Sequence, residues 1–262
     1  MKTRIISAII ACLIVIPIVY FGGFAYRVGV GILAVIGYTE FLMAYETKRK
    51  IPNIVKMIGY IALFTIFAIN VLNKNIFNIN YKEIIFIIII FLIPIILYHD
   101  DKTYNTTDAL YLIGGTIFLG IAFSILYTLR ESGLETIIYL VTITISADTF
   151  AYFTGVLFGK HKMIPTISPN KTWEGAFGGT FFSVILASIY YLTYLNGDAN
   201  IFAVITMTIF LSIISQFGDL IFSAMKRHVG IKDFSNIMPG HGGILDRLDS
   251  LILVMLAYML IL

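Results

Sequence analysis

Residues 218–250 of this chain combine apolar side chains with a dense group of charges and read GDLIFSAMKRHVGIKDFSNIMPGHGGILDRLDS. Apolar runs long enough to span a bilayer lie on both sides of this stretch. Charges are costly inside a membrane, so a dense group of them between two apolar runs indicates a functional site. The charged residues of this stretch, apart from the histidines, are Asp219, Asp233, Asp246, Asp249, Lys226, Arg227, Lys232 and Arg247.

The composition is that of a membrane protein and excludes a water-soluble globular chain. Hydrophobic residues make up 59% of the 262 residues, charged residues make up 13%, and the mean hydropathy is +0.92. So few charged side chains cannot cover a water-facing surface, but they suit a bundle of membrane helices. Cys12 is the only cysteine, which excludes an intramolecular disulfide and a cysteine metal cluster.

The sequence predicts an all-α, polytopic membrane helix bundle with about nine transmembrane helices. A span needs about 20 mainly apolar residues. We expect an uncleaved N-terminal segment to form the first span. The predicted spans are 5–24, 28–45, 54–72, 83–98, 109–128, 134–157, 173–195, 200–222 and 244–262.

The distribution of cations predicts the orientation of the bundle. With nine spans, the 18 Lys and Arg residues fall on one side of the membrane except for Arg27, Lys74, Lys82 and Arg130. The positive-inside rule places the richer side, with the N-terminus, in the cytoplasm. We expect residues 1–132 to form an N-terminal transmembrane scaffold and residues 133–262 to form a C-terminal catalytic region with its active site at the cytoplasmic face. Glu40, in the scaffold, is either a functional acid or one that reaches the membrane edge, and we favour the second.

The sixth predicted span carries an acid within an apolar helix. Tyr152, Gly155 and Gly159 follow Asp148 at helical offsets, so they share its face. Such a carboxylate faces the bundle interior or a polar cavity rather than lipid. A hydrogen bond to a neighbouring helix is the alternative to a binding role.

The loop after this span predicts an anion site. Ser168 and Pro169 indicate a turn and the start of a helix. Lys171 and Thr172 would then lie near a helix N-terminus, where free N–H groups favour a phosphate. Glu174 is a metal ligand, an ion-pair partner of Lys171, or an acid favoured by the helix dipole.

Within the stretch 218–250, helical spacing groups the functional side chains. Asp219, Ser223 and Lys226 share one helix face, and Asp246 and Asp249 share another. The run PGHGG at 239–243 cannot be a stable helix interior. Its glycines either allow a phosphate to approach or form a plain loop. His241 is a donor to phosphate, a neighbour of a metal, or a structural residue of the loop.

Three segments together resemble the phosphatidate cytidylyltransferase (CDP-diacylglycerol synthase) family. The resemblance is strongest in Ser223, Lys226-Arg227, Lys232-Asp233, Pro239–Gly243 and Leu245–Asp249. Residues 148–155 resemble the family pattern Asp-Thr-x-Ala-Tyr-x-x-Gly. Residues 168–175 resemble Ser-Pro-Lys-Lys-Thr-x-Glu-Gly, with Asn170 in place of a lysine. The resemblance implies a polytopic membrane enzyme that joins CTP to phosphatidic acid and releases pyrophosphate. It also implies a homodimer.

This reaction explains the residue types. The attacking phosphate oxygen is already ionised, so a strong general base is unnecessary, whereas bringing two anions together requires a metal and cations. We therefore expect Mg²⁺ as cofactor, with Asp219, Asp246 and Asp249 as its ligands and Asp148 close by. The predicted catalytic residues are Asp219, Lys226, Arg227, Asp246, Arg247 and Asp249. The predicted substrate-binding residues are Asp148, Ser168, Lys171, Thr172, Glu174, Ser223, Lys232, His241, Gly242 and Gly243.

Two other functions are alternatives to the transfer of CMP to phosphatidic acid. A related CTP-dependent lipid enzyme, of the CDP-archaeol synthase or polyprenol kinase type, would carry a similar motif, although the archaeal enzymes are typically shorter. An ion-coupled transporter would place charges near the midplane and show repeated halves. The charges cluster instead toward the C-terminal third. The expected partners are CTP, phosphatidic acid and membrane lipid, with no nucleic acid, in a bacterial inner membrane.

Overall fold

The computed structural model describes residues 2–73, 81–98, 100 and 102–262. Lys74, one of the cations in the predicted charge partition, lies outside them. The described residues form nine α-helices, one π-helical turn and one two-stranded hairpin. Seven of these described helices are long and apolar enough to cross a membrane, and Ile6–Phe21 is a shorter apolar helix. The predicted all-α, polytopic membrane architecture is therefore confirmed, with the hairpin as an addition.

The chain divides into two compact units. The first unit comprises Met1–Glu131 and Val229–Leu245, and the second comprises Ser132–His228 and Asp246–Leu262. The assignment of a scaffold role to residues 1–132 and a catalytic role to residues 133–262 remains a prediction, because compactness does not test a role.

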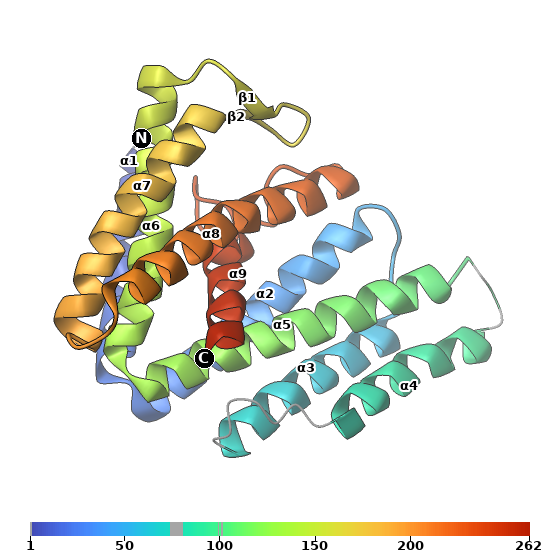
Figure 1. Cartoon of the computed structure of the whole chain (residues 1–262). Coiled ribbons are helices and arrows are strands. Elements are labelled where there is room, and N and C mark those ends of the chain that lie inside the picture. The colour runs from blue at the N-terminus through green and yellow to red at the C-terminus, as the bar shows by residue number, and fades with distance from the viewer. Residues whose placement is uncertain (1, 74–80, 99, 101) are drawn as a thin grey trace. The chain divides into compact units, whose positions relative to one another are not determined.

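The first unit is built mainly from helices of the N-terminal half, coloured blue to green in Figure 1, together with the loop that precedes the last helix. Its helices are α1 (Lys2–Phe21), α2 (Gly23–Glu46), α3 (Asn53–Asn73), α4 (Tyr81–Tyr98) and α5 (Thr106–Ser132).

Buried aromatic rings form the core of the first unit. Tyr38 is fully buried, and its hydroxyl shares a hydrogen bond of 2.8 Å with the hydroxyl of Thr116. Phe41 stacks on Tyr111 with ring centroids 4.4 Å apart. Gly115 of α5 leaves the space that the Phe41 ring fills. Packing between α2 and α5 is thus specified by aromatic shape together with one satisfied polar pair.

The second unit contains the remaining helices, coloured yellow-green to red in Figure 1. Its elements are α6 (Leu134–Phe158), β1 (Lys162–Ile164), β2 (Ser168–Thr172), α7 (Trp173–Tyr190), the π-helical turn Tyr191–Leu195, α8 (Ile201–Val229) and α9 (Leu245–Ile261). Two terminal residues of these helices, Val229 of α8 and Leu245 of α9, belong to the first unit.

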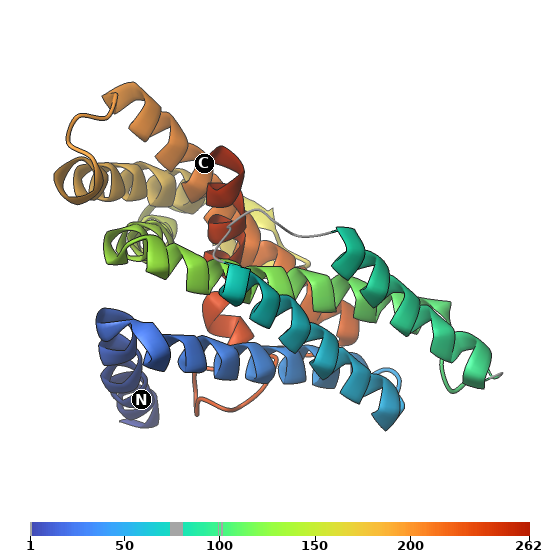
Figure 2. The same ribbon diagram turned by 90° about the horizontal axis from the view of Figure 1, so that it is seen from below.

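Small residues allow α6 and α7 to pack closely. The two helices lie side by side in both views (Figure 1; Figure 2). A Cβ atom at Gly175 would lie 2.7 Å from the carbonyl oxygen of Ala151, and one at Gly179 would lie 2.5 Å from that of Ala147. Membrane helices associate through such close backbone approach, because lipid provides no hydrophobic driving force between them.

The segment after α6 differs from the prediction. Ser168 and Pro169 do not start a helix: they begin β2, which pairs antiparallel with β1, with Lys162 opposite Thr172. The residue before a proline favours extended backbone, and a two-stranded hairpin has only edge strands, where proline is tolerated. The helix begins at Trp173. Thr172 is its N-cap, and its Oγ1 accepts a hydrogen bond of 3.1 Å from the N–H of Gly175.

Candidate active site

A pocket of about 500 Å³ lies within the second unit, between α6, the hairpin, α7 and α8. Asp148, Tyr152, Gly155 and Gly159 all line it, as their helical spacing predicts. The hairpin and the start of α7 contribute Lys162, Asn170, Lys171, Thr172 and Gly175, and α8 contributes Gln216 and Asp219. Asp148 therefore faces a cavity, as expected for a carboxylate within an apolar helix, and its role in binding remains a prediction.

An ion pair crosses this pocket. The Nζ atom of Lys171 lies 2.6 Å from Oδ2 of Asp219, and their side chains are 25% and 31% exposed. Asp148 is close enough to interact electrostatically with both side chains and with Arg247. The pocket thus presents two carboxylates and a lysine that remain accessible, an arrangement that suits phosphate groups and a divalent metal.

A second, buried ion pair joins α8 to the first turn of α9. The Nζ atom of Lys226 lies 2.6 Å from Oδ1 of Asp246, and the two side chains are only 9% and 2% exposed. Ser223 lies one turn before Lys226 and donates a hydrogen bond of 3.3 Å to Oδ1 of Asp219. Asp219, Ser223 and Lys226 therefore share one face of α8, as their spacing predicts. This face contributes one residue to each of the two ion pairs.

Asp249 completes this cluster. It is half-buried and interacts electrostatically with Asp219, Asp148 and Lys226. The two helices approach closely because Gly218 has no side chain: a Cβ atom there would lie 2.9 Å from Cα of Ser250. The second unit therefore gathers the predicted carboxylates of α6, α8 and α9 around two lysines. Arg227 and Arg247 are exposed on α8 and α9.

Two of the predicted substrate-binding residues in the segment of the hairpin and the start of α7 do not line this pocket. Ser168 and Glu174 are not among the described residues that line it. Glu174 accepts hydrogen bonds from the N–H groups of Lys160 and His161 and lies 2.6 Å from Nδ1 of His161. It therefore anchors the turn between α6 and β1, whereas Lys171 pairs with Asp219.

The other predicted residues belong to the loop of the first unit. Lys232 is exposed. The hydroxyl of Ser7 lies 2.9 Å from Nδ1 of His241 and donates a hydrogen bond of 3.2 Å to the carbonyl of Pro239. Gly242 has a φ of +85°, a left-handed conformation that favours glycine. His241 thus has a structural partner in α1, one of the alternatives for this residue.

The favoured expectation for Glu40, a side chain that reaches water at the membrane edge, is wrong, because its carboxylate is fully buried. It accepts hydrogen bonds from the hydroxyl of Ser235 at 2.6 Å and from the N–H groups of Ile244 at 2.9 Å and Leu245 at 2.8 Å. Spacing along the chain gives no signal for these contacts, because the partners are about two hundred positions away and meet only in the folded unit.

The carboxylates of the second unit fit a magnesium ion that is shared with a phosphate ligand. The described part of the chain contains no group of three or more His, Cys, Asp or Glu side chains arranged to hold a metal by themselves. Mg²⁺ does not need such a cage, since it is commonly bound by one or two carboxylates, phosphate oxygens and water. Asp219, Asp148 and Asp249 are oxygen donors of this kind. The ligand set Asp219, Asp246 and Asp249 remains a prediction.

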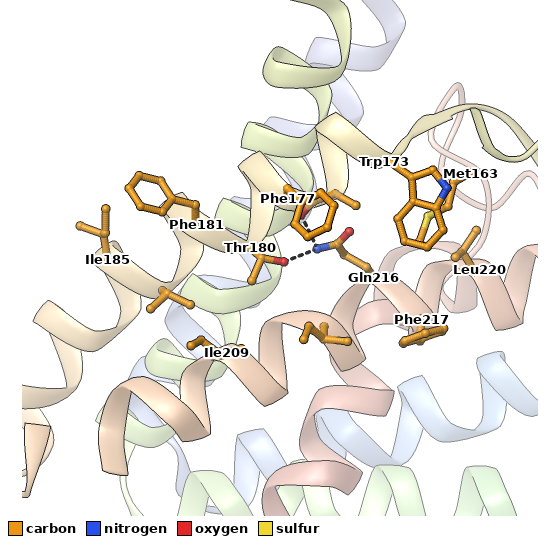
Figure 3. Close-up of a pocket in the computed structure, with 13 residues that line it drawn as sticks. Met163, Trp173, Phe177, Thr180, Phe181, Ile185, Ile209, Gln216, Phe217 and Leu220 are labelled. Atoms are coloured by element: carbon orange, nitrogen blue, oxygen red, sulfur yellow. Dashed lines mark hydrogen bonds between the residues drawn. The ribbon is translucent and has the colours of Figure 1, made fainter. Parts of the chain in front are cut away.

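An apolar groove of about 730 Å³ adjoins the charged pocket, and Figure 3 shows the side chains that line this groove. It lies between α7 and α8 and is lined by aromatic and aliphatic side chains, including Trp173, Phe177 and Phe217. Gln216 donates hydrogen bonds to the hydroxyl of Thr180 at 2.8 Å and to the carbonyl of Ala176 at 3.1 Å. The groove and the pocket share three lining residues: Met163, Ala176 and Gln216.

Comparisons with known proteins cover nearly the whole chain. The family model described as "Cytidylyltransferase family" matches residues 2–262. The chain is 37% identical over 261 residues to the phosphatidate cytidylyltransferase of Staphylococcus haemolyticus (strain JCSC1435), covering 97% of this chain and 96% of that protein. It is 36% identical over 258 residues to the phosphatidate cytidylyltransferase of Staphylococcus aureus (strain COL), with the same coverage. The phosphatidate cytidylyltransferase of Staphylococcus epidermidis (strain ATCC 12228) is 36% identical over 256 residues.

Proposed function

This chain belongs to the cytidylyltransferase family, and we propose that it is the membrane enzyme that converts CTP and phosphatidic acid to CDP-diacylglycerol and pyrophosphate. The similarity to proteins named phosphatidate cytidylyltransferase extends over 97% of the chain and so includes both compact units. The seven long apolar helices of the described residues place the chain in a membrane, where a lipid substrate is available.

The observation that carries the proposal is the direct continuity of a charged pocket with an apolar groove. Phosphatidic acid combines an anionic phosphate with two hydrocarbon chains. The pocket presents Lys171 beside Asp148 and Asp219, and the groove next to it is lined almost entirely by hydrophobic side chains. A lipid lying with a chain in the groove would therefore bring its phosphate to the lysine.

The reaction demands electrostatic assistance more than proton transfer. An ionised phosphate oxygen of the lipid forms a bond with the α-phosphorus of CTP, while the bond from that phosphorus to the bridging oxygen breaks and pyrophosphate leaves with the electron pair. No proton must be removed from the nucleophile. The principal barrier is the approach of two anions and the charge that collects on pyrophosphate.

The side chains of this chain would meet these demands in three ways. Lys171 would hold a phosphate in the pocket, and the exposed Arg227 and Arg247 would contribute further positive charge. Lys226 would fix the orientation of Asp246. Asp219, Asp246 and Asp249, with Asp148 nearby, would hold Mg²⁺. When bound, this ion would supply positive charge that neutralises the phosphates and aligns them.

We propose that the active site faces the cytoplasm, where CTP is found. The support is the uneven distribution of Lys and Arg between the predicted loops. Reporter fusions at Lys162 and His228 should read as cytoplasmic, and a fusion at Asn196 should read as external. An external reading at Lys162 would contradict the mechanism, because CTP would not reach the pocket. The homodimer implied by the family remains a proposal, which the mass of the detergent-solubilised protein tests.

Transfer of labelled CMP to lipid tests the function. Purified protein is incubated with CTP labelled in the α-phosphate, phosphatidic acid and Mg²⁺, and the lipid products are separated. We expect a labelled CDP-lipid and release of pyrophosphate, and we expect EDTA to abolish both. Polyprenol and CTP labelled in the γ-phosphate form a parallel reaction. Transfer of label only to polyprenol, or no labelled lipid from folded protein, would contradict the proposed function.

A further inference from the structure

Glu40 is a fully buried acid that the reaction scheme does not use. It lies in α2, and its carboxylate accepts hydrogen bonds from the Ser235 hydroxyl and from the N–H groups of Ile244 and Leu245. All four residues belong to the first compact unit. An ionised carboxylate offers only acceptors, so three donors converging on it make a chemically complete arrangement.

The two backbone donors are significant because they lie at the start of α9: Ile244 directly precedes the helix, and Leu245 is its first residue. This helix begins at Leu245, so the N–H groups of Ile244 and Leu245 have no partner within the helix. The N-terminus of a helix also carries a partial positive charge that favours an anion. Such ends are usually capped by a side chain close in sequence, whereas here the cap comes from α2.

The backbone next to this contact is adapted to it. Gly243 packs directly on the carboxylate of Glu40, where any Cβ atom would collide with the carboxylate oxygens. The preceding Gly242 adopts a left-handed conformation, and its carbonyl accepts a hydrogen bond of 3.0 Å from the N–H of Met238. The glycine run therefore brings the start of α9 against a single acid of α2.

We propose that Glu40 is a positioning residue for the first turn of α9 and thereby for Asp246. Asp246 directly follows Leu245, so a shift of that N–H group moves its Cα atom as well. The inference rests on the proposed function, because orienting Asp246 matters for turnover only if Asp246 serves the reaction. Glu40 acts through the backbone of α9, as outer residues orient the groups that bind a metal or a phosphate.

The test compares Glu40→Gln with Glu46→Gln in the full-length protein. Glu46 ends the same helix and pairs with Lys56 at 2.7 Å, so it is a matched carboxylate outside the proposed site. Gln keeps the shape of Glu40 but places an NH₂ group where an acceptor is needed. We expect kcat of Glu40→Gln to fall by about 10- to 100-fold, the typical loss for an outer-shell change. We expect KM for CTP to change by less than about twofold.

Amide hydrogen exchange gives a readout that does not depend on activity. In Glu40→Gln, the amides of Ile244 and Leu245 should exchange faster, while those of α3 and α5 keep parental rates. Ser235→Ala removes only one donor and serves as a milder variant if Glu40→Gln does not fold. It should show the same pattern with a smaller loss of kcat. Glu46→Gln should match the parent in both measurements.

The possible failures can be told apart. Parental kcat in Glu40→Gln, in a parent that makes CDP-lipid, would overturn the inference and leave the proposed function intact. Loss of kcat in proportion to loss of folded protein, with unchanged amide exchange, would also overturn it. If the parent forms no CDP-lipid, the proposed function fails and the positioning role fails with it. Faster exchange in Glu40→Gln would then identify Glu40 as a structural cap alone.

Discussion

The second unit contains two lysine–aspartate ion pairs with the same N–O distance of 2.6 Å but different surroundings. The pair Lys171–Asp219 lines the charged pocket, and its side chains are 25% and 31% exposed. The pair Lys226–Asp246 joins α8 to α9, and its side chains are 9% and 2% exposed. Two ion pairs of the same residue types and the same N–O distance can therefore have different roles, and the exposure of their side chains is what distinguishes them.

The physical reason is desolvation. An accessible pair retains much of its hydration, so either partner can exchange its ion for a ligand at little cost. In a buried pair, each charge has lost its hydration and depends on the other, so removing one partner leaves an uncompensated charge. We therefore expect Lys171–Asp219 to control ligand binding, and Lys226–Asp246 to hold two helices together as well as to orient a carboxylate.

The largest effect is expected from Lys226→Met, which breaks the buried pair. Leaving the Asp246 carboxylate buried without this cation should destabilise the protein by about 3–5 kcal/mol. The measurement is thermal unfolding in detergent, with Lys226→Arg as the control that keeps the charge. A Lys226→Met protein that melts at the parental temperature would show that the buried pair contributes no more than an exposed one.

Breaking the accessible pair should have little effect on stability and a large effect on turnover. Asp219→Asn and Lys171→Ala should each cost less than about 1 kcal/mol of stability, the usual range for exposed pairs. Turnover should fall by about 10²- to 10³-fold, the typical loss when a group that stabilises transition-state charge is removed. Formation of CDP-lipid is measured beside the melting temperature. Parental turnover in either variant would remove that residue from the proposed active site.

Gly218→Ala would disturb the packing of α8 against α9, the two helices that the buried pair joins. The added Cβ atom would lie 2.9 Å from Cα of Ser250 and 3.0 Å from the carbonyl of Asp249, so α8 and α9 must separate. Overpacking of this kind costs about 1–3 kcal/mol. Gly114→Ala is the control, because nothing lies within 4 Å of a Cβ atom there. Equal melting temperatures for the two variants would contradict the close approach of α8 and α9.

The smallest expected effect is the change of melting-temperature differences with ionic strength. At about 0.1 M ionic strength, charges are screened over about 10 Å in water, whereas buried pairs are screened much less. The difference in melting temperature between the parent and Asp219→Asn should therefore shrink as salt is raised. The difference between the parent and Lys226→Met should stay nearly constant. An equal salt response of the two differences would mean that solvent reaches both pairs alike.

Local patterns were sufficient to predict several contacts of the second unit. The helical offsets of Tyr152, Gly155 and Gly159 from Asp148 correctly predicted one pocket-lining face, because helix geometry is the same in any fold. The spacing of Asp219 and Ser223 likewise placed them on one helix face, and the structure shows a hydrogen bond between them. The same approach failed at Ser168 and Pro169, since a turn signal before a helix does not distinguish a loop from a short strand that pairs with its neighbour.

The amino-acid sequence alone was enough to identify this chain as an all-α membrane protein of the cytidylyltransferase family. Long apolar runs and a dense, rare motif carry that information locally, so no fold is needed to read it. The folded structure was needed to show which lysine pairs with which aspartate, which of these pairs is buried, and that Glu40 caps α9. These facts depend on which segments meet in the folded units, and hydration lost on burial, rather than residue type, then sets what each charge can do.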